Sequence, residues 1–146
     1  MTTEVNFRIV LLRPPAGVLF GLQKGSGSDY ETVQTQRSGT QDLAFQFQAK
    51  IKVEDNGFVN LLGPFVQGPK NGRFVYIDIG SYAGEKGTQW SRRLKIPLTG
   101  ISQKDIKAVQ MNTASVLESK VEGKGKDGTP ACGTAKPFKG WHIAGA

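Results

Sequence analysis

Every second side chain in residues 43–53 is apolar and, apart from Ala44, the side chains between them are polar; this pattern constrains the fold more than any other feature of the chain. Successive side chains of a β-strand point to opposite faces, so a period of two residues predicts a strand with one buried face. The segment 54–57, Glu-Asp-Asn-Gly, then ends the strand with residues typical of a tight turn. The buried face is expected to hold Leu43, Phe45, Phe47, Ala49, Ile51 and Val53.

Shorter segments along the chain repeat this strand pattern and are separated by turn-forming residues. Two Gly-Pro pairs, at 63–64 and 68–69, bracket a very short strand, because proline cannot donate a hydrogen bond to a neighbouring strand. The 19 glycines also favour turns and strands over long helices. Further strands are predicted over 5–11, 18–24, 30–37, 58–62, 73–80, 90–97, 116–123 and 136–143.

A single segment has the pattern of a helix. Residues 102–105, Ser-Gln-Lys-Asp, precede the apolar Ile106 and Val109 and resemble a capping box with aspartate in the position of the acid. We therefore predict one short helix over 102–110. With about eight short strands, this indicates an all-β fold, an antiparallel barrel or sandwich, and the length of 146 residues indicates one domain over 1–146.

The composition excludes several classes of site. One cysteine and one histidine cannot form an internal disulfide or a metal site of cysteine and histidine ligands, and no glycine-rich dinucleotide or phosphate motif is present. We therefore expect no metal and no cofactor. Charged residues precede any long apolar run at the N-terminus, and no apolar stretch is long enough to cross a membrane. A cytoplasmic protein without a membrane partner is expected.

The formal net charge of +7 admits two interpretations. It can keep the surface soluble, or it can attract nucleic acid. We favour the first, because the positive residues are spread along the chain and no arginine-rich cluster marks a phosphate track. Phe74 and Tyr76 lie in a predicted strand and could stack nucleobases, but core packing explains them more simply. A nucleic-acid partner is therefore not expected.

The candidate site lies where the predicted strands 73–80 and 90–97 pair. If the loop between them closes symmetrically, Asp78 faces Arg92 on an otherwise apolar face that also holds Tyr76. A structural ion pair is the simpler interpretation of this arrangement. An acid and an arginine retained on an apolar face are nevertheless where a polar ligand would bind.

Three further side chains extend this candidate site. Trp90 would supply an aromatic wall, and Gln34 and Gln67 would supply amides, which suit ligands rich in hydroxyl or amide groups. No catalytic residue is assigned, because Asp78 has no second carboxylate on its predicted face. The candidate ligand-binding residues are Tyr76, Asp78, Trp90, Arg92, Gln34 and Gln67.

Several sequence blocks are distinctive as a set. Gly-Pro-Phe-Val-Gln-Gly-Pro at 63–69 and Trp-Ser-Arg-Arg at 90–93 are the most specific, and further blocks lie at 15–25, 33–38, 72–82 and 128–132. Together they resemble a bacterial family catalogued as a domain of unknown function, number fifty-nine ninety. The resemblance covers most of the chain. It implies no activity, cofactor or catalytic residue.

These observations favour a protein that acts by binding a small polar ligand or a protein partner, rather than by catalysis. Three alternatives stay open. The first is a carboxylate-based enzyme centred on Asp78, with Tyr76 as an acid. The second is a basic nucleic-acid-binding barrel. The third is a self-assembling structural protein, because exposed strand edges also suit homo-oligomers. The sequence does not identify the partner or the ligand.

Overall fold

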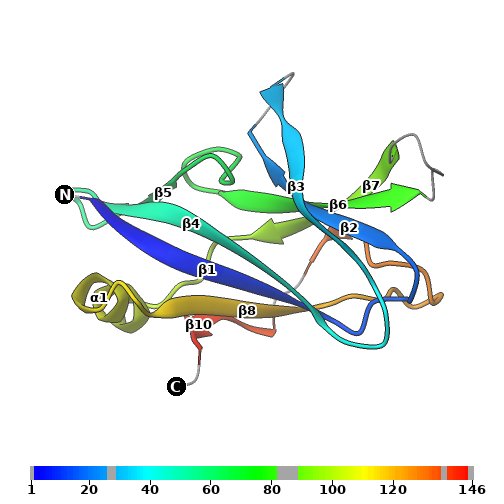
Figure 1. Cartoon of the computed structure of the whole chain (residues 1–146). Coiled ribbons are helices and arrows are strands. Elements are labelled where there is room, and N and C mark those ends of the chain that lie inside the picture. Colours follow the sequence, from blue (N-terminus) through cyan, green and yellow to red (C-terminus); the bar gives the residue numbers. More distant parts are fainter. Residues whose placement is uncertain (1, 26–28, 82–88, 136–137, 145–146) are drawn as a thin grey trace.

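The computed structural model describes residues 2–25, 29–81, 89–135 and 138–144. They form ten strands and one helix (Figure 1). The all-β class and the short helix are thereby confirmed. The elements are β1 (Thr2–Leu12), β2 (Leu19–Lys24), β3 (Glu31–Arg37), β4 (Leu43–Val53), β5 (Val59–Leu62), β6 (Phe74–Ser81), β7 (Gln89–Pro97), α1 (Gln103–Met111), β8 (Val116–Glu122), β9 (Gly133–Thr134) and β10 (Phe138–Ile143).

Two five-stranded sheets enclose the core. The first sheet has the strand order β10-β8-β1-β4-β5, and the second has the order β3-β2-β6-β7-β9. Figure 1 shows them as two layers, with α1 at the end where β5 lies. Most neighbouring strands are antiparallel, as predicted, but both sheets are mixed, because β1 pairs with β8 and β7 pairs with β9 in parallel. Side-chain alternation reports which face of a strand is buried and carries no information on strand direction.

The long alternating segment forms β4 with the predicted bounds, and its burial follows the alternation. Phe47 stacks on Phe7 of β1 at 5.1 Å between ring centroids, and Trp141 of β10 meets Phe7 edge-on at 5.5 Å. Val53 is 39% exposed, so the inward face ends two residues earlier than predicted, at Ile51. The core is therefore centred on aromatic residues from three strands of the first sheet.

The predicted helix cap is present. The backbone N–H of Asp105 donates to the Ser102 hydroxyl at 3.1 Å, and Ile106 and Val109 are the buried residues of α1. The predicted short strand between the Gly-Pro pairs does not form. In its place, Gln67 makes an isolated bridge to Phe74. β9 lies outside the predicted strands.

Glutamine side chains connect the two sheets along one side. Gln34 sits at an irregularity in β3 with a φ of 54°, and its side-chain amide donates to the carbonyl of Gln46 in β4. The N–H of Gln46 donates back to Gln34 Oε1 at 3.2 Å. The amide of Gln36 donates to the carbonyl of Ala44 at 2.8 Å. β5 pairs with β4 only from Lys50 onward. Before that point, at Ala44 and Gln46, the glutamine amides form hydrogen bonds with the backbone of β4.

Candidate functional site

The strands that carry the predicted site pair one residue out of the expected register. Next to the loop, Gly80 faces Trp90, as symmetric closure predicts. β7 then has one extra residue, Ser91, and beyond this bulge Asp78 faces Arg93. The predicted pairing of Asp78 with Arg92 is therefore wrong. The loop residues 82–88 lie outside the described residues.

This bulge changes which side of β7 shares a face with each side of β6, because a shift of one residue moves the paired side chains to the other face. Leu94 and Ile96 now lie opposite Ile77 and Val75, so the apolar sides of both strands form one face. Val75, Ile77 and Ile79 are therefore buried in the core, where Tyr76 and Asp78 had been expected. Tyr76 and Asp78 lie on the outer face of the second sheet, opposite Lys95 and Arg93.

Asp78 is almost completely buried although it lies on this outer face. Its side chain is 1% exposed. The Thr32 hydroxyl donates to Oδ2 at 2.9 Å, and Arg93 Nε lies 3.6 Å from Oδ1, too far for a hydrogen bond. Among the described residues, Oδ1 has no hydrogen-bond partner. Burial raises the pKa of the Asp78 carboxyl, and the hydrogen bond from Thr32 and the charge of Arg93 oppose that effect.

A glycine in the adjacent strand allows Asp78 to be covered. Gly21 of β2 is the direct partner of Asp78. A methyl group at Gly21 would meet Thr32 and would lie 3.3 Å from Trp90 Cη2. Only glycine leaves room for these two side chains above the sheet at this point. Of the predicted set, the structure thus places Asp78 and Tyr76 on the outer face of the sheet and Trp90 beside Gly21, the strand partner of Asp78.

The buried carboxylate predicts a pH-dependent difference between the wild type and an Asp78→Asn variant. A pKa raised in the folded state gives a stabilisation that is present below the unfolded value of 3.8 and is lost as the pH rises through the folded-state pKa. Asparagine stays neutral and keeps an acceptor for Thr32, while Arg93 stays charged throughout. At pH 7 we expect the variant to be the more stable protein. Below pH 3.8 the two should converge.

Urea denaturation of both proteins at a series of pH values measures this difference. The unfolding midpoints should approach each other as the pH falls from 7. A wild type that is more stable than the variant at pH 7 would contradict the expectation, because it would mean that the ion pair with Arg93 outweighs the cost of burying the charge.

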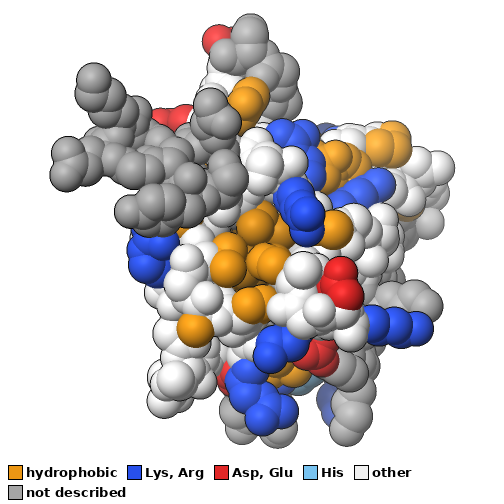
Figure 2. All heavy atoms as spheres, turned by 90° about the vertical axis from the view of Figure 1, so that its right-hand side faces the viewer, with side chains coloured by type: hydrophobic (Ala, Val, Ile, Leu, Met, Phe, Trp, Pro, Cys, Tyr) orange, Lys and Arg blue, Asp and Glu red, His pale blue; other side chains and the backbone are white. Residues whose placement is uncertain are grey.

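The other predicted residues lie apart from Asp78. Gln34 binds the edge of β4, and the Gln67 amide donates to Gln23 Oε1 at 2.6 Å beside the outer face. Arg92 is exposed and lines a shallow recess of about 270 Å³ with Val18, Ile79 and Pro130 among its other residues. Figure 2 views this end of the molecule, where apolar side chains gather beside lysine and arginine side chains.

A carboxylate lies close to Arg92. The hydroxyl and the backbone N–H of Thr129 donate to Asp127 Oδ1 at 2.6 and 3.1 Å. These hydrogen bonds hold the pKa of Asp127 below its usual value, and the charge of Arg92 contributes a smaller part. The charge of Arg92 thus acts on the carboxylate of Asp127, whereas the charge of Arg93 acts on that of Asp78.

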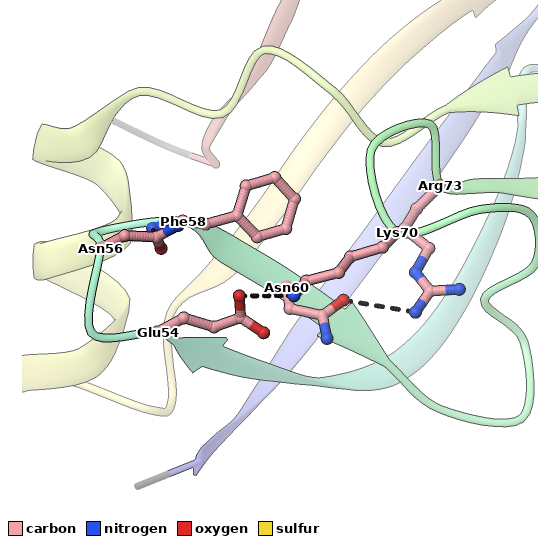
Figure 3. Close-up of polar contacts among 6 residues, drawn as sticks. All are labelled: Glu54, Asn56, Phe58, Asn60, Lys70 and Arg73. Carbon is pink, nitrogen blue, oxygen red and sulfur yellow. Dashed lines mark hydrogen bonds and ion pairs between the residues drawn. The ribbon is translucent and has the colours of Figure 1, made fainter.

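The structure also contains a cleft that was not predicted from the sequence and that includes none of the predicted site residues. It has a volume of about 340 Å³ and lies between the β4–β5 turn, the segment before β6 and the segment that joins β7 to α1 (Figure 3). Turn residues were recognisable in the first two segments, but nothing in the sequence showed that they meet. The cleft is lined by Gly57, Phe58, Val59, Leu61, Lys70, Asn71, Arg73, Leu98, Thr99, Gly100, Ile101 and Gln103.

Local hydrogen bonds fix the shape of this cleft. The β4–β5 turn is closed by Glu54, whose N–H donates to the Phe58 carbonyl at 2.8 Å, and Gly57 adopts a φ of 84° that favours glycine. The Asn56 side chain accepts from the Phe58 N–H at 3.0 Å. On the opposite side, the N–H of Leu98 donates to the Arg73 carbonyl at 2.9 Å. Two walls of the cleft are thus held by backbone contacts.

Lys70 is neutralised by a partner within the protein. Its ammonium lies 2.6 Å from Glu54 Oε1 and 5.3 Å from the centre of the Phe58 ring. Figure 3 shows the lysine chain extending across the β5 strand toward Glu54. This pair is partly exposed and therefore contributes little to stability. Lys70 therefore lines one side of the cleft, but its positive charge is balanced by that of Glu54.

Arg73 is held by neutral acceptors. Its guanidinium donates to Asn60 Oδ1 at 3.3 Å and to the carbonyl of Gly68. Asn60 is a buried residue of β5 and so fixes the position of the guanidinium (Figure 3). The Nε atom of Arg73 is buried and has no hydrogen-bond partner among the described residues. No carboxylate in the described part of the chain forms an ion pair with Arg73.

Comparison with known protein families covers nearly the whole chain. Residues 5–144 match the model of a family described as a family of unknown function, DUF5990. The chain belongs to this family. The match agrees with the resemblance found in the sequence blocks, and it includes every residue of the cleft as well as Asp78, Thr32 and Arg93. Searches of curated proteins and of solved structures found no match for this DUF5990 protein.

Neither a metal site nor a membrane-spanning helix is found in the described part of the DUF5990 chain. No group of three or more histidine, cysteine, aspartate and glutamate side chains lies close enough to hold a metal ion there. No helix within those residues is long and apolar enough to cross a membrane. Among the hollows lined by described residues, the cleft beside Arg73 combines an apolar lining with a charged side chain that has no carboxylate partner in the described part of the chain.

Proposed function

We propose that this protein binds a small organic anion with an apolar body, such as a carboxylate, in the cleft beside Arg73. The observation that supports the proposal most directly is the charge of Arg73, which is oriented by neutral acceptors and has no carboxylate partner among the described residues. A guanidinium has five N–H donors and matches the geometry of a carboxylate with two parallel hydrogen bonds. Two donors are used within the described residues.

The rest of the lining supplies an apolar surface. Phe58, Val59, Leu61, Leu98 and Ile101 contribute side chains to the cleft. A volume of about 340 Å³ lies at the lower end of the range for small-molecule sites. The lining contains no aspartate, glutamate, histidine or cysteine, so it lacks the groups that acid–base or nucleophilic catalysis uses most often. These features favour binding over an enzymatic reaction.

Titration calorimetry with a matched panel of compounds tests the proposal. The panel consists of aliphatic and aromatic carboxylates and their primary amides, which have nearly the same size but no charge. At least one carboxylate is expected to bind, and its amide is expected to bind at least tenfold more weakly, because a hydrogen bond to a charged group contributes about 1.5–3 kcal/mol. If no carboxylate binds, or if acids and amides bind equally, the proposal is wrong.

An Arg73→Gln variant is expected to weaken carboxylate binding by about tenfold or more, because it removes the charge and the paired donors. Arg73→Lys, which keeps the charge without the planar fork, should fall between that variant and the wild type. Arg37→Gln is the matched control. Arg37 is exposed and also donates to a backbone carbonyl, that of Gly17 at 3.1 Å, but it lies outside the cleft. Equal losses in the two glutamine variants would show a general charge effect.

A further inference from the structure

A second surface combines positive charge with aromatic rings on the outer face of the sheet β3-β2-β6-β7-β9. Phe74 and Tyr76 of β6 are partly exposed, and their ring centroids lie 4.9 Å apart. The guanidinium carbon of Arg93 lies 4.7 Å from the centre of the Tyr76 ring. The ammonium of Lys95 lies 4.3 Å from the centre of the Phe74 ring. We call these four residues the cation–aromatic patch.

The register of β6 and β7 produces this patch. Arg93 is directly opposite Asp78, and Lys95 is directly opposite Tyr76. Each cation extends diagonally past its direct partner to the preceding aromatic residue of β6. The bulge at Ser91 therefore places two cations and two aromatic rings on one solvent-facing side, although the same residues are scattered in the sequence.

The positive charges of the patch are only weakly compensated. Within the described residues, Lys95 has no carboxylate in an ion pair. Arg93 is 47% exposed, and its contact with Asp78 is 3.6 Å long. A guanidinium that stacks on an aromatic ring has a second flat face, and such a face can stack on another planar group. The patch therefore offers a stacking surface and a free ammonium side by side.

We infer that the cation–aromatic patch binds single-stranded nucleic acid, with a base stacked on the Arg93 guanidinium and a neighbouring phosphate bound by Lys95. Stacking on aromatic and arginine side chains together with contacts to phosphate is how sheet surfaces bind single strands without reading their sequence. The net charge of +7 favours the approach of a polyanion. An acidic peptide would use the charges but would not need the stacked rings. The inference goes beyond the proposed function and uses different residues.

Fluorescence anisotropy with a labelled ten-nucleotide oligothymidylate tests this inference at low salt. The wild type is expected to bind, and the logarithm of the affinity should fall linearly with the logarithm of the salt concentration. An abasic strand of the same length has the same charges without bases. It is expected to bind about tenfold more weakly, because one stacked base is lost. Equal binding of the two strands, or no binding of oligothymidylate at low salt, would overturn the inference.

An Arg93→Lys variant separates stacking from charge. It keeps the positive charge and the ion pair with Asp78 but lacks the planar group, so oligothymidylate should bind about tenfold more weakly and the abasic strand should be unaffected. Arg37→Lys is the matched control. A thermal melt shows that each variant is folded. An unchanged affinity in Arg93→Lys, or polyglutamate binding as tight as that of oligothymidylate, would overturn the inference.

The carboxylate proposal and the nucleic-acid inference can be disproved independently of each other. Arg73→Gln is expected to abolish most carboxylate binding and to reduce oligothymidylate binding only to the extent that Arg37→Gln does. Arg93→Lys is expected to leave carboxylate binding unchanged. If Arg73→Gln alone removes oligothymidylate binding, the nucleic acid binds at the cleft, and the assignment to the cation–aromatic patch is wrong.

Discussion

Replacement of Phe47 by alanine is expected to lower the free energy of unfolding by about 3–5 kcal/mol, the usual cost of removing a buried aromatic side chain. Phe47 is 5% exposed and lies between two other aromatic rings, stacked on Phe7 and tilted against Phe65 at 5.7 Å. Phe65 lies in the segment between β5 and β6, so the loss would reach beyond β4. Urea denaturation followed by circular dichroism measures the difference.

The neighbouring Gln46→Ala is the control for this experiment. Gln46 is exposed on the opposite face of β4, and only its backbone is hydrogen-bonded to Gln34. Its replacement should change the free energy of unfolding by no more than about 0.5 kcal/mol, as is usual for surface positions. If Gln46→Ala were the more costly change, the inner and outer faces of β4 would have to be exchanged.

Replacement of Trp141 by alanine is expected to cost about 3–5 kcal/mol as well, for a different combination of reasons. Trp141 is 2% exposed and packs edge-on against Phe7. Its indole N–H also donates to the carbonyl of Pro97 at 2.8 Å, and its backbone forms a bridge to Ile101. This residue of β10 therefore anchors the segment that forms one wall of the cleft.

A Trp141→Phe variant distinguishes packing from the hydrogen bond. It keeps an aromatic ring but leaves the Pro97 carbonyl without its donor, which should cost about 1–3 kcal/mol. Both variants should shift the methyl NMR signals of Ile101, because the wall of the cleft loses an anchor. A Trp141→Ala protein that unfolds at the same urea concentration as the wild type would contradict the burial of this side chain.

Local patterns were sufficient to predict most individual elements. The bounds of β4 could be predicted because its alternation is unbroken, and the predicted strand over 5–11, which lies within β1, follows the same rule. The cap at Ser102 predicted the start of α1, because the capping hydrogen bond lies within four consecutive residues. In each case the signal and its physical cause are both local.

The pairing of strands could not be predicted with the same success. The register of β6 and β7 depends on whether Ser91 is paired or bulged, and either choice leaves the alternation of each strand intact. The parallel pairing of β1 with β8 joins residues far apart in the chain, for example Ile9 with Ser119. Alternation within one strand contains no information about such a partner.

The cleft was missed for a related reason. Arg73 is held in position by Asn60 on another strand, and the facing wall of the cleft comes from the segment that includes Leu98. In the sequence, Arg73 is an ordinary charged residue after a Gly-Pro turn. By contrast, Asp78 could be recognised in the sequence as an unusual acid in an apolar strand, and it is buried in the structure, although its partner and its face were predicted wrongly. An unexpected residue type can be recognised locally, whereas a cavity depends on several segments.

The glutamine side chains of β3 have a consequence for how this chain behaves at high concentration. A strand edge with free N–H and carbonyl groups is a template on which a second chain can add a strand, which is a common first step in aggregation. At Ala44 and Gln46 those groups are already bound by the amides of Gln36 and Gln34. A second copy that added a strand there would first have to break three hydrogen bonds. Two amide side chains thus protect the longest alternating strand of the fold from edge-to-edge association.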